Sequence, residues 1–353
     1  MNPDKTVFSC HNPEWRGERP APSLIARCAQ LAMLLEVSAS PKPGNVDREH
    51  NYPDTCFEHF VASSVAVYPV FELAAKSTGR IGQLLRSAVY ESSAWQQGGN
   101  THFGAFLLLI PPLAMAAGEI SREQGEQPGC GKTFFRIEAE EFENLASHAH
   151  AFVRETDCED AVEFYRAFGH AGVRVNSVEE FDLEDPEATS DLRNQNITLY
   201  SLMEIAKGYD LIANEWTSGF GRCLEGAKII LDFMDARNCR EEALAGGSVS
   251  ICSGTGGVNE AVVYTFLKLL SKHRDTFIQT KFDAETADYV SSRAGEVLSG
   301  WEISGKKAGD FAFILPRIQE FDSELLDKRI NPGSTADIII AALFIALLGG
   351  LRF

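Results

Sequence analysis

The sequence predicts a mainly helical protein, and three observations support that class. Apolar residues recur with a period near 3.6 from Leu24 to Leu348, which is the spacing of amphipathic helices. Few segments alternate apolar and polar residues with the period of two that strands require. The chain has 353 residues, 44% of them hydrophobic and 23% charged, enough for a sizeable core. We therefore expect mainly α structure, as a single large multi-helix domain with an inserted, partly irregular middle segment.

Composition along the chain suggests four parts. Residues 1–22 are rich in proline and polar side chains and are predicted to form an N-terminal arm. Residues 23–118 are expected to be helical and to carry the first motifs. Residues 119–197 form a predicted acidic insertion, which contains the irregular stretch 178–196. Residues 198–353 are expected to complete the same domain with further helices.

The charge balance excludes several classes of partner. The formal net charge is −18, so we expect no nucleic acid and no membrane as a partner. A polyanionic substrate would need a local cationic pocket or Mg²⁺ to overcome this field. The apolar run Ile338–Leu351 is too short to span a bilayer and is predicted to be a buried C-terminal helix.

The cysteines and the N-terminus point to a cytoplasmic protein. None of the eight cysteines forms a C-x-x-C pair, and no His/Cys cluster has zinc spacing, so we expect reduced, mostly buried thiols. The first residues contain no apolar leader. Homodimerisation is kept as a candidate assembly.

The first predicted helix leads into a loop that carries charges. Ser23 can cap a helix from Leu24 to about Ser38, which Pro41 ends. The loop that follows contains two prolines and a glycine, so it should be rigid. It presents Lys42, Asp47 and Arg48, and rigid loops are where binding residues concentrate. The alternative is a solvated connector. Two further helices are predicted at Phe57–Lys76 and Gly79–Gln97.

The third helix carries a carboxylate on its apolar stripe. Leu84, Ala88, Glu91 and Trp95 fall on one helical face at steps of four, three and four. We therefore expect Glu91 to be shielded by Trp95 and its pKa to be raised.

A glycine turn follows this helix. Gly98-Gly99 should stop it, because glycine enters left-handed backbone without steric cost. Asn100 or Thr101 can cap a fourth helix, Phe103–Ala117, which Pro111-Pro112 should bend or break. A helix N-terminus with His102 beside it predicts an anion or nucleotide site. The alternative is a structural joint.

The middle of the chain offers fewer candidates. Glu138–Phe168 is predicted to be helical and solvated, and its two histidines, His148 and His150, should lie on different faces and not bind a metal. Leu199–Asp235 is strongly helical, with Asp210 at the edge of its apolar stripe. Helices are also expected at Ala261–Ser271, after a second glycine turn, and at Asp283–Leu298.

The last motif opens the final helix. Ser334 or Thr335 would cap it, and Asp337 would sit in its first turn, where the helix dipole favours a carboxylate. Because the helix behind it is apolar on all sides, Asp337 should enter a buried region. There it can hold a metal ion or a substrate hydroxyl.

Taken together, these motifs resemble the triphosphoribosyl-dephospho-CoA synthase family. The resemblance spans nearly the whole chain and rests on four segments: Glu36-Val-Ser with Pro41-Lys-Pro-Gly-Asn-Val-Asp47, Gly98-Gly-Asn-Thr-His-Phe-Gly104, Asp275-Thr276, and Asn331-Pro-Gly-Ser-Thr-Ala-Asp337. It implies a helical transferase of coenzyme biosynthesis that moves the triphosphoribosyl group of ATP to the 2′-hydroxyl of 3′-dephospho-CoA and releases adenine. Phe103 stands where those enzymes usually have lysine.

The resemblance and the chemistry together suggest roles for individual residues. Cleavage of an N-glycosidic bond needs acid–base groups, for which Glu91 is the first candidate and Asp47 the second. Mg²⁺ would neutralise the triphosphate, held by Asp210, Asp275 and Asp337. The predicted substrate- and nucleotide-binding residues are Lys42, Gly44, Arg48, Gly98, Gly99, Asn100, Thr101, His102, Asn331 and Gly333.

Two alternatives remain open at this point. The first is a related (phospho)ribosyl or nucleotide transfer in another coenzyme pathway, such as that of a pterin. The second is a non-catalytic helical protein that binds a nucleotide.

Overall fold

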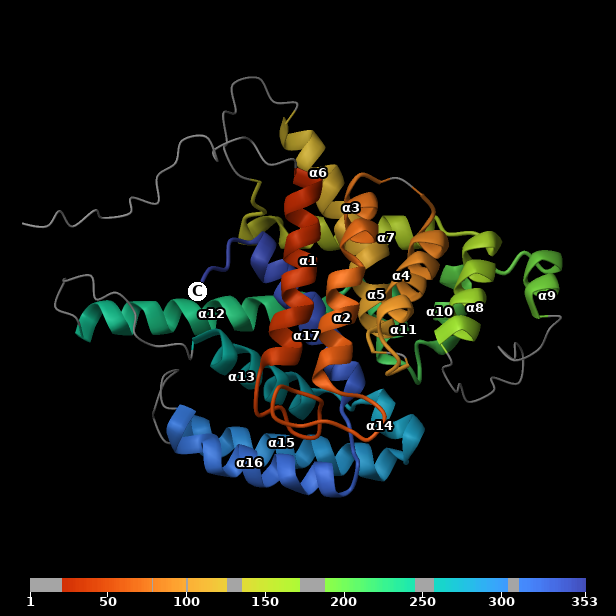
Figure 1. The fold of residues 1–353 in the computed structure, drawn as a ribbon. Helices are drawn as coiled ribbons and strands as arrows, with labels where there is room; N and C mark the ends of the chain where they lie inside the picture. The colour runs from red at the N-terminus through yellow and green to blue at the C-terminus, as the bar shows by residue number, and fades with distance from the viewer. Residues whose placement is uncertain are drawn as a thin grey trace, which may run out of the picture.

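The computed structural model describes residues 21–77, 79–99, 101–125, 135–171, 188–244, 257–303 and 311–353, and every statement about structure refers to these ranges. All regular elements within them are helical, so the predicted fold class is confirmed (Figure 1). The elements are α1 (Ala21–Ser38), α2 (Phe57–Ala66), α3 (Tyr68–Ala75), α4 (Ile81–Trp95), α5 (Phe103–Leu108), the π-helix η2 (Leu109–Ala114), α6 (Met115–Gly125), the 3₁₀ turn η3 (Ala139–Glu141), α7 (Phe142–Arg154), α8 (Cys158–Ala171), α9 (Ala188–Asn194), α10 (Leu199–Ala206), α11 (Leu211–Ser218), α12 (Gly221–Leu244), α13 (Gly257–Lys272), α14 (Thr276–Lys281), α15 (Ala284–Ile303), α16 (Phe311–Asp327) and α17 (Gly333–Leu348).

Helix α17 is the centre of the fold. Every residue from Ile338 to Leu348 is buried, as expected of a helix that is apolar on all sides. Helices α1, α5, α12 and α13 pack directly against it. The prediction of a buried C-terminal helix is therefore confirmed. The first turn of α17 brings the last motif into the interior of the domain.

A second layer supports the charged loop. Helices α15 and α16 lie side by side below the central bundle, and the loop 39–56 runs between them and the lower ends of α1 and α2 (Figure 1). The middle segment also packs on the bundle, with α8 against α4 and α7 against η2. Gly82 of α4 approaches α8 so closely that an added Cβ would lie 2.5 Å from the carbonyl oxygen of Asp160.

Several predicted helices are broken in the structure. The segment Phe57–Lys76 divides at Val67 into α2 and α3, because Pro69 has no N–H to continue the first helix. The predicted fourth helix widens into η2 around Pro112 before α6 continues it. The segment Leu199–Asp235 divides into three helices, and Gly219, with φ +83°, ends the second of them.

One long apolar helical segment lies mostly in the interior. By length and composition Phe103–Gln124 is apolar enough to cross a membrane, with a mean hydropathy of 1.7, but 86% of that window is buried inside the fold. This is also the behaviour of a core helix in a globular protein.

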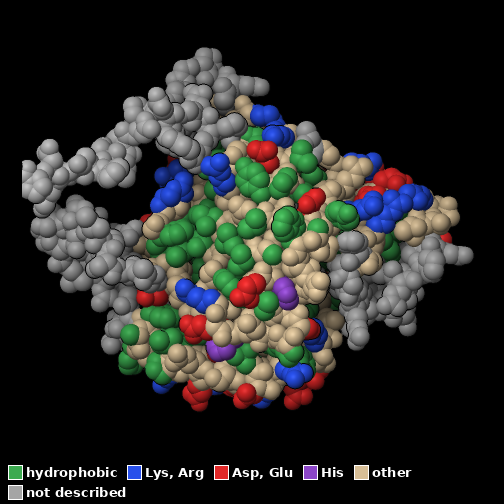
Figure 2. Space-filling view, in the orientation of Figure 1, with side chains coloured by type: hydrophobic (Ala, Val, Ile, Leu, Met, Phe, Trp, Pro, Cys, Tyr) green, Lys and Arg blue, Asp and Glu red, His purple; other side chains and the backbone are tan. Residues whose placement is uncertain are grey.

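Apolar side chains are exposed over α1, α2 and α3 (Figure 2), where Leu31, Val65 and Leu73 contribute.

Candidate active site

Two of the predicted motifs meet at Asp337. The N–H of Ala105 at the start of α5 donates to Asp337 Oδ1 over 2.9 Å. Gly104 lies so close that an added Cβ would be 2.2 Å from Asp337 Oδ2, so only glycine fits there. The turn before α5 and the turn before α17, more than 200 residues apart in the chain, therefore form one site.

The charged loop contributes a buried ion pair to the same region. Lys42 is fully buried and pairs with Glu36, which is 2% exposed and lies in the last turn of α1. Burial raises the pKa of Asp337 well above its ordinary value, and the negative charge of Glu36 raises it further. The positive charge of Lys42 contributes to a lowered pKa of His102 in the glycine turn. The loop, the glycine turn and the α17 turn are thus electrostatically coupled.

The three aspartates predicted to bind a metal lie close enough for their charges to interact, but their oxygens differ in availability. The negative charges of Asp275 and Asp210 both contribute to the raised pKa of Asp337. A chain of hydrogen bonds connects the three segments: the Leu211 N–H donates to Thr276 Oγ1 over 3.0 Å, and that hydroxyl lies 3.1 Å from Ser334 Oγ.

Asp275 has no oxygen left for a metal ion. Its Oδ1 accepts the N–H groups of Phe277 and Ile278, and its Oδ2 accepts the N–H and the hydroxyl of Thr335 at 2.8 and 2.7 Å. The side chain is fully buried and caps α14 against α17. The prediction of Asp275 as a ligand is corrected accordingly: it is a structural cap.

Asp337 keeps an oxygen, Oδ2, that no described side chain or backbone N–H occupies, whereas the Asp210 carboxylate is used more fully. Asp210 caps α11: the Ala213 N–H donates to Oδ1 over 2.9 Å, and the Ile212 N–H also bonds the carboxylate. Asp337 accepts one bond, from Ala105. Both side chains are half-buried, and burial raises the pKa of each. Two desolvated carboxylates of like charge are a favourable environment for a divalent cation.

The start of α5 is already occupied by a protein carboxylate. The sequence predicted that phosphate binds at this helix N-terminus, but Asp337 takes the Ala105 N–H and α5 has only six residues. Asn100, one of the predicted caps, lies outside the described residues. Thr101 Oγ1 is buried and donates or accepts no hydrogen bond among those residues, so Thr101 is not the cap.

The glycine turn itself is held by neighbouring side chains. Gln96 Nε2 donates to the carbonyl of Gly99 over 2.9 Å, and Gln96 Oε1 accepts the Gly98 N–H. His59 packs against Gly98, where an added Cβ would lie 2.1 Å from the ring Nδ1. Gly99 has a φ of +67°. The close packing at Gly98 and the left-handed backbone at Gly99 explain why this turn contains two glycines.

His102 is buried beside the glycine turn. It is 1% exposed, its Nδ1 lies 2.9 Å from Ser63 Oγ, and the Phe60 ring packs edge-on against it at 4.9 Å. Burial and then the Lys42 charge lower the pKa of His102 to about 3, so the ring is neutral at physiological pH. Its Nε2 has no partner among the described residues.

Asp47 organises the loop and is fully buried. Its Oδ1 accepts the N–H groups of Glu49 and His50 at 2.7 and 3.0 Å, and its Oδ2 accepts the Lys42 N–H at 3.3 Å. A carboxylate used in this way has little capacity to take a substrate proton, so the second candidate for the base is better explained as a loop anchor.

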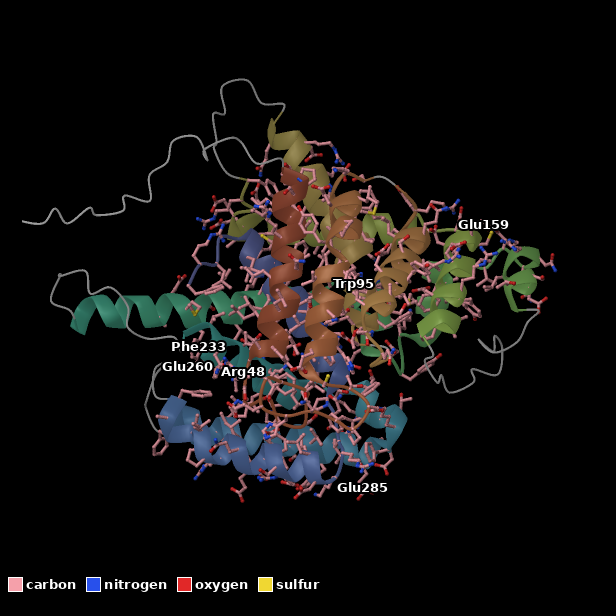
Figure 3. All side chains as sticks on the ribbon, viewed as in Figure 1. Arg48, Trp95, Glu159, Phe233, Glu260 and Glu285 are labelled. Atoms are coloured by element: carbon pink, nitrogen blue, oxygen red, sulfur yellow. The ribbon has the colours of Figure 1, made fainter. Side chains whose placement is uncertain are left out.

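Gly44 and Arg48 have different roles within the same loop. Gly44 has a φ of +73° and donates its N–H to Asp322 Oδ1 of α16 over 2.9 Å, so it packs the loop on α16. Arg48 is exposed, and its guanidinium donates to Asn259 Oδ1 over 2.8 Å (Figure 3). Asn259 also bonds both backbone groups of Ser40 at 2.9 Å, which fixes the loop to the start of α13.

Glu91 does not have the predicted environment. Leu84 and Ala88 on its stripe are buried, but Glu91 is only partly buried and Trp95 is 74% exposed (Figure 3). The stripe leaves the core at the last turn of α4. The shielding by Trp95 that justified Glu91 as the first candidate for the acid or base is therefore absent, and that expectation was wrong.

The remaining predicted residues lie in the α17 turn. Asn331 Oδ1 is buried without a partner among the described residues. A Cβ at Gly333 would lie 3.0 Å from the Phe277 ring, so this glycine permits close packing of α14 on α17.

Sequence reasoning missed several contributors. Ser63 and Ser92 were not considered, since a serine inside an apolar helix gives no signal by itself. Asp322 was missed because it belongs to no motif. His148, set aside as a ligand, lies 3.0 Å from Glu119, and with Glu123 these side chains place ligand atoms within 4.8 Å of one another. Neither glutamate is buried, so a surface hydrogen bond between His148 and Glu119 explains the contact.

Comparison with known proteins identifies the family of the chain. The family model described as ATP:dephospho-CoA triphosphoribosyl transferase matches residues 22–352. A protein of Vibrio cholerae described as a probable 2-(5''-triphosphoribosyl)-3'-dephosphocoenzyme-A synthase is 22% identical over 350 residues, covering 92% of this chain and 88% of that protein. A protein of Streptococcus equi with the same description is 34% identical over 118 residues, covering 30% of this chain and 39% of the relative.

A solved structure is also similar. The crystal structure from Archaeoglobus fulgidus, provisionally described as a triphosphoribosyl-dephospho-CoA synthase, matches with a TM-score of 0.56 and 25% identity. The match covers 83% of this chain and all of that one. With a family model spanning nearly the whole chain, the protein belongs to the ATP:dephospho-CoA triphosphoribosyl transferase family.

Proposed function

We propose that this protein transfers the triphosphoribosyl group of ATP to the 2′-hydroxyl of 3′-dephospho-CoA and releases adenine. The observation that carries the proposal is the convergence of three family motifs at Asp337: the first through the charge of Glu36, the second through the start of α5, and the third through the turn before α17, which carries Asp337 itself. A scaffold protein has no need of a half-buried cluster of carboxylates at such a junction, because the repulsion between them destabilises the fold.

The reaction creates positive charge that this cluster is suited to stabilise. The bond between C1′ of the ribose and N9 of adenine breaks, and a new bond forms between C1′ and the acceptor oxygen. The acceptor hydroxyl loses a proton, and the leaving adenine gains one. Such displacements pass through a state with oxocarbenium character. Asp337, Asp210 and Glu36 are carboxylates in a poorly solvated region, where an ionised carboxylate stabilises positive charge most strongly.

Two of the three predicted ligands are our candidates for Mg²⁺. Asp337 Oδ2 accepts no hydrogen bond from the described residues, and we propose that it holds the ion together with the Asp210 carboxylate, with Asp275 serving only to position α17. Bound there, Mg²⁺ would neutralise charge on the triphosphate. Arg48, exposed and held by Asn259, is the cation that we assign to the outer end of the triphosphate.

One observation favours the second candidate function, transfer to a different coenzyme acceptor such as a pterin. Phe103 is 7% exposed and packs on Phe164 and Phe168 of α8, with ring centroids 5.9 and 4.3 Å apart. An aromatic cluster thus fills the position where the family usually places a lysine. A change of this kind beside the glycine turn alters the charge that a substrate meets.

A substrate panel tests the function and separates the two candidates. The protein is incubated with ATP, Mg²⁺ and either 3′-dephospho-CoA or another hydroxyl-bearing coenzyme precursor, and free adenine is measured by chromatography. The product is identified by its mass. Adenine release that depends on dephospho-CoA supports the first proposal, and release with another acceptor supports the second. No release with any acceptor, from a protein that binds ATP, would indicate a nucleotide-binding protein without this activity.

A further inference from the structure

A chain of buried polar side chains connects two helices to the glycine turn. The Ser92 hydroxyl of α4 donates to Ser63 Oγ of α2 over 2.8 Å, and Ser63 Oγ lies 2.9 Å from His102 Nδ1. All three side chains are at most 4% exposed. No other part of the proposed reaction accounts for this arrangement.

The direction of the Ser92 bond favours one position for the imidazole proton. Because Ser63 Oγ accepts the Ser92 proton, its own proton is free to be donated to Nδ1 of His102. Nδ1 is then an acceptor, and a neutral imidazole must carry its hydrogen on Nε2. Burial and the charge of Lys42 keep the ring neutral, since together they lower the pKa of His102 to about 3.

The resulting Nε2–H has no acceptor among the residues that the structure describes, and it is enclosed by protein. The same is true of the hydroxyl of Thr101, the preceding residue. Folded proteins rarely leave buried donors unpaired, so two adjacent ones require an explanation. A ligand with a hydrogen-bond acceptor would explain both donors. Because the donors are enclosed, the ligand must shift the adjacent turn to reach them.

We propose that His102 is a neutral hydrogen-bond donor, through Nε2–H, to a triphosphate oxygen of ATP, and that Ser63 and Ser92 are positioning residues that fix this tautomer. The inference rests on the proposed function, because it takes ATP as the ligand. The nearby Lys42 favours an anionic acceptor over a ring nitrogen of adenine. A ring that stays neutral neither protonates adenine nor deprotonates the acceptor hydroxyl, so His102 is not the acid or the base.

Nuclear magnetic resonance of the protein labelled with ¹⁵N-histidine tests the tautomer and the ligand. We expect the His102 signals to show hydrogen on Nε2 and no titration between pH 5 and 8. Adding Mg²⁺ with inorganic tripolyphosphate should shift the Nε2–H signal, and adding adenosine should not. Hydrogen on Nδ1, titration in that range, a shift with adenosine alone, or no shift with tripolyphosphate would each overturn the proposal.

Matched serine variants test the positioning roles. Ser63→Ala removes the bond to His102, and we expect the KM for ATP to rise about tenfold with kcat changed much less. Ser64→Ala is the control, because the Ser64 hydroxyl is also buried but bonds only to its own helix, at Phe60. Ser63→Thr keeps a hydroxyl and should restore most of the affinity. Equal effects of Ser63→Ala and Ser64→Ala would show that the serines only stabilise the fold.

Failure of this inference is distinguishable from failure of the proposed function. Wild-type protein that releases adenine from ATP while the His102 signals remain unchanged on tripolyphosphate binding would reject the role of His102 and leave the transferase intact. Wild-type protein that binds no ATP in calorimetry would instead reject the function on which the inference rests.

Discussion

Asp337 combines three properties that rarely occur in one carboxylate. It contacts a glycine that tolerates no side chain, it accepts a single backbone hydrogen bond, and the neighbouring charges of Glu36, Asp275 and Asp210 oppose its ionisation. The burial and these charges raise its pKa, so at moderately acidic pH a proton competes with a metal ion for Oδ2. Metal affinity at this site should therefore increase as the pH rises.

Replacing Asp337 by asparagine tests that interpretation. Asp337→Asn keeps an oxygen for the Ala105 N–H and removes an unfavourable buried charge, so we expect an equal or higher melting temperature near pH 8. We also expect Mg²⁺ affinity, measured by calorimetry with ATP, to fall at least tenfold and to lose its dependence on pH. Exposed Asp232 provides the control, as Asp232→Asn should change neither quantity. Unchanged Mg²⁺ affinity in Asp337→Asn would contradict the assignment.

Asp275 should respond in the opposite way. Its amide variant cannot accept both bonds from Thr335 while also capping α14, so Asp275→Asn should destabilise the fold by about 1–3 kcal/mol. The affinity of the remaining folded protein for Mg²⁺ should stay the same. Together the two variants separate a ligand from a structural cap.

Loop 39–56 and helix α16 are joined by a titratable contact. Asp322 of α16 is 2% exposed, accepts the Gly44 N–H, and lies 3.2 Å from His50 Nδ1. Burial raises the pKa of Asp322 to about 6, with the charges of Asp47 and Glu49 adding to the effect and the Gly44 bond and His50 opposing it. A carboxyl with a raised folded-state pKa stabilises the fold most below its unfolded pKa. That stability is lost as the pH rises through about 6.

Asp322→Asn should therefore stabilise the protein at pH 8, by up to about 3 kcal/mol, and the gain should disappear below about pH 4. Denaturant unfolding at several pH values measures the difference. Asp327→Asn on the exposed side of the same helix is the matched control and should be neutral throughout. A gain that is constant with pH would mean that Asp322 does not titrate as described.

The close approach of α5 to α17 is a property of two elements together. In Gly104→Ala the new methyl group would displace Asp337, so we expect a loss of about 1–3 kcal/mol in stability and a clear loss of Mg²⁺ affinity. Gly295→Ala in α15 is the control, because its Cβ would come no closer than 3.9 Å to Ser271. That change should stabilise by about 0.5–1 kcal/mol, and equal melting temperatures for the two variants would contradict this account.

For the molecule as a whole, charge opposes the substrate. A net charge of −18 repels ATP over the long Debye length of dilute buffer, about 30 Å at 0.01 M, and much less over the roughly 8 Å of 0.15 M salt. At saturating Mg²⁺, we expect the KM for ATP to fall several-fold between these ionic strengths. Steady-state kinetics in sodium chloride, repeated with sucrose as an uncharged control, measure this. A KM that rises with salt would show that the cationic groups at the loop dominate the field.

The sequence predicted the fold more completely than the site. The pattern of apolar residues located α1, which buries one face, and α17, which is apolar and buried on all sides. The breaks at Val67 and at Gly219 were missed, since periodicity continues across short interruptions. The resemblance supplied Asp275 and Asp337, and the need to hold Mg²⁺ beside a triphosphate added Asp210 to the set. The saturation of Asp275 depends on Thr335, 60 residues away, and Glu91 lost its shield because α4 leaves the core there. Cytoplasmic location and homodimerisation stay predictions.

The exposure of Trp95 makes the site observable by optical spectroscopy. This indole is 74% exposed at the last residue of α4, three residues before Gly98, whereas Trp216 is fully buried and bonded to the Leu107 carbonyl. Emission from Trp95 should be red-shifted and readily quenched by acrylamide, in contrast to that of Trp216. A nucleotide that rearranges the turn will change the first signal and spare the second. Comparison with Trp95→Phe then gives a binding assay that needs neither a label nor knowledge of the acceptor.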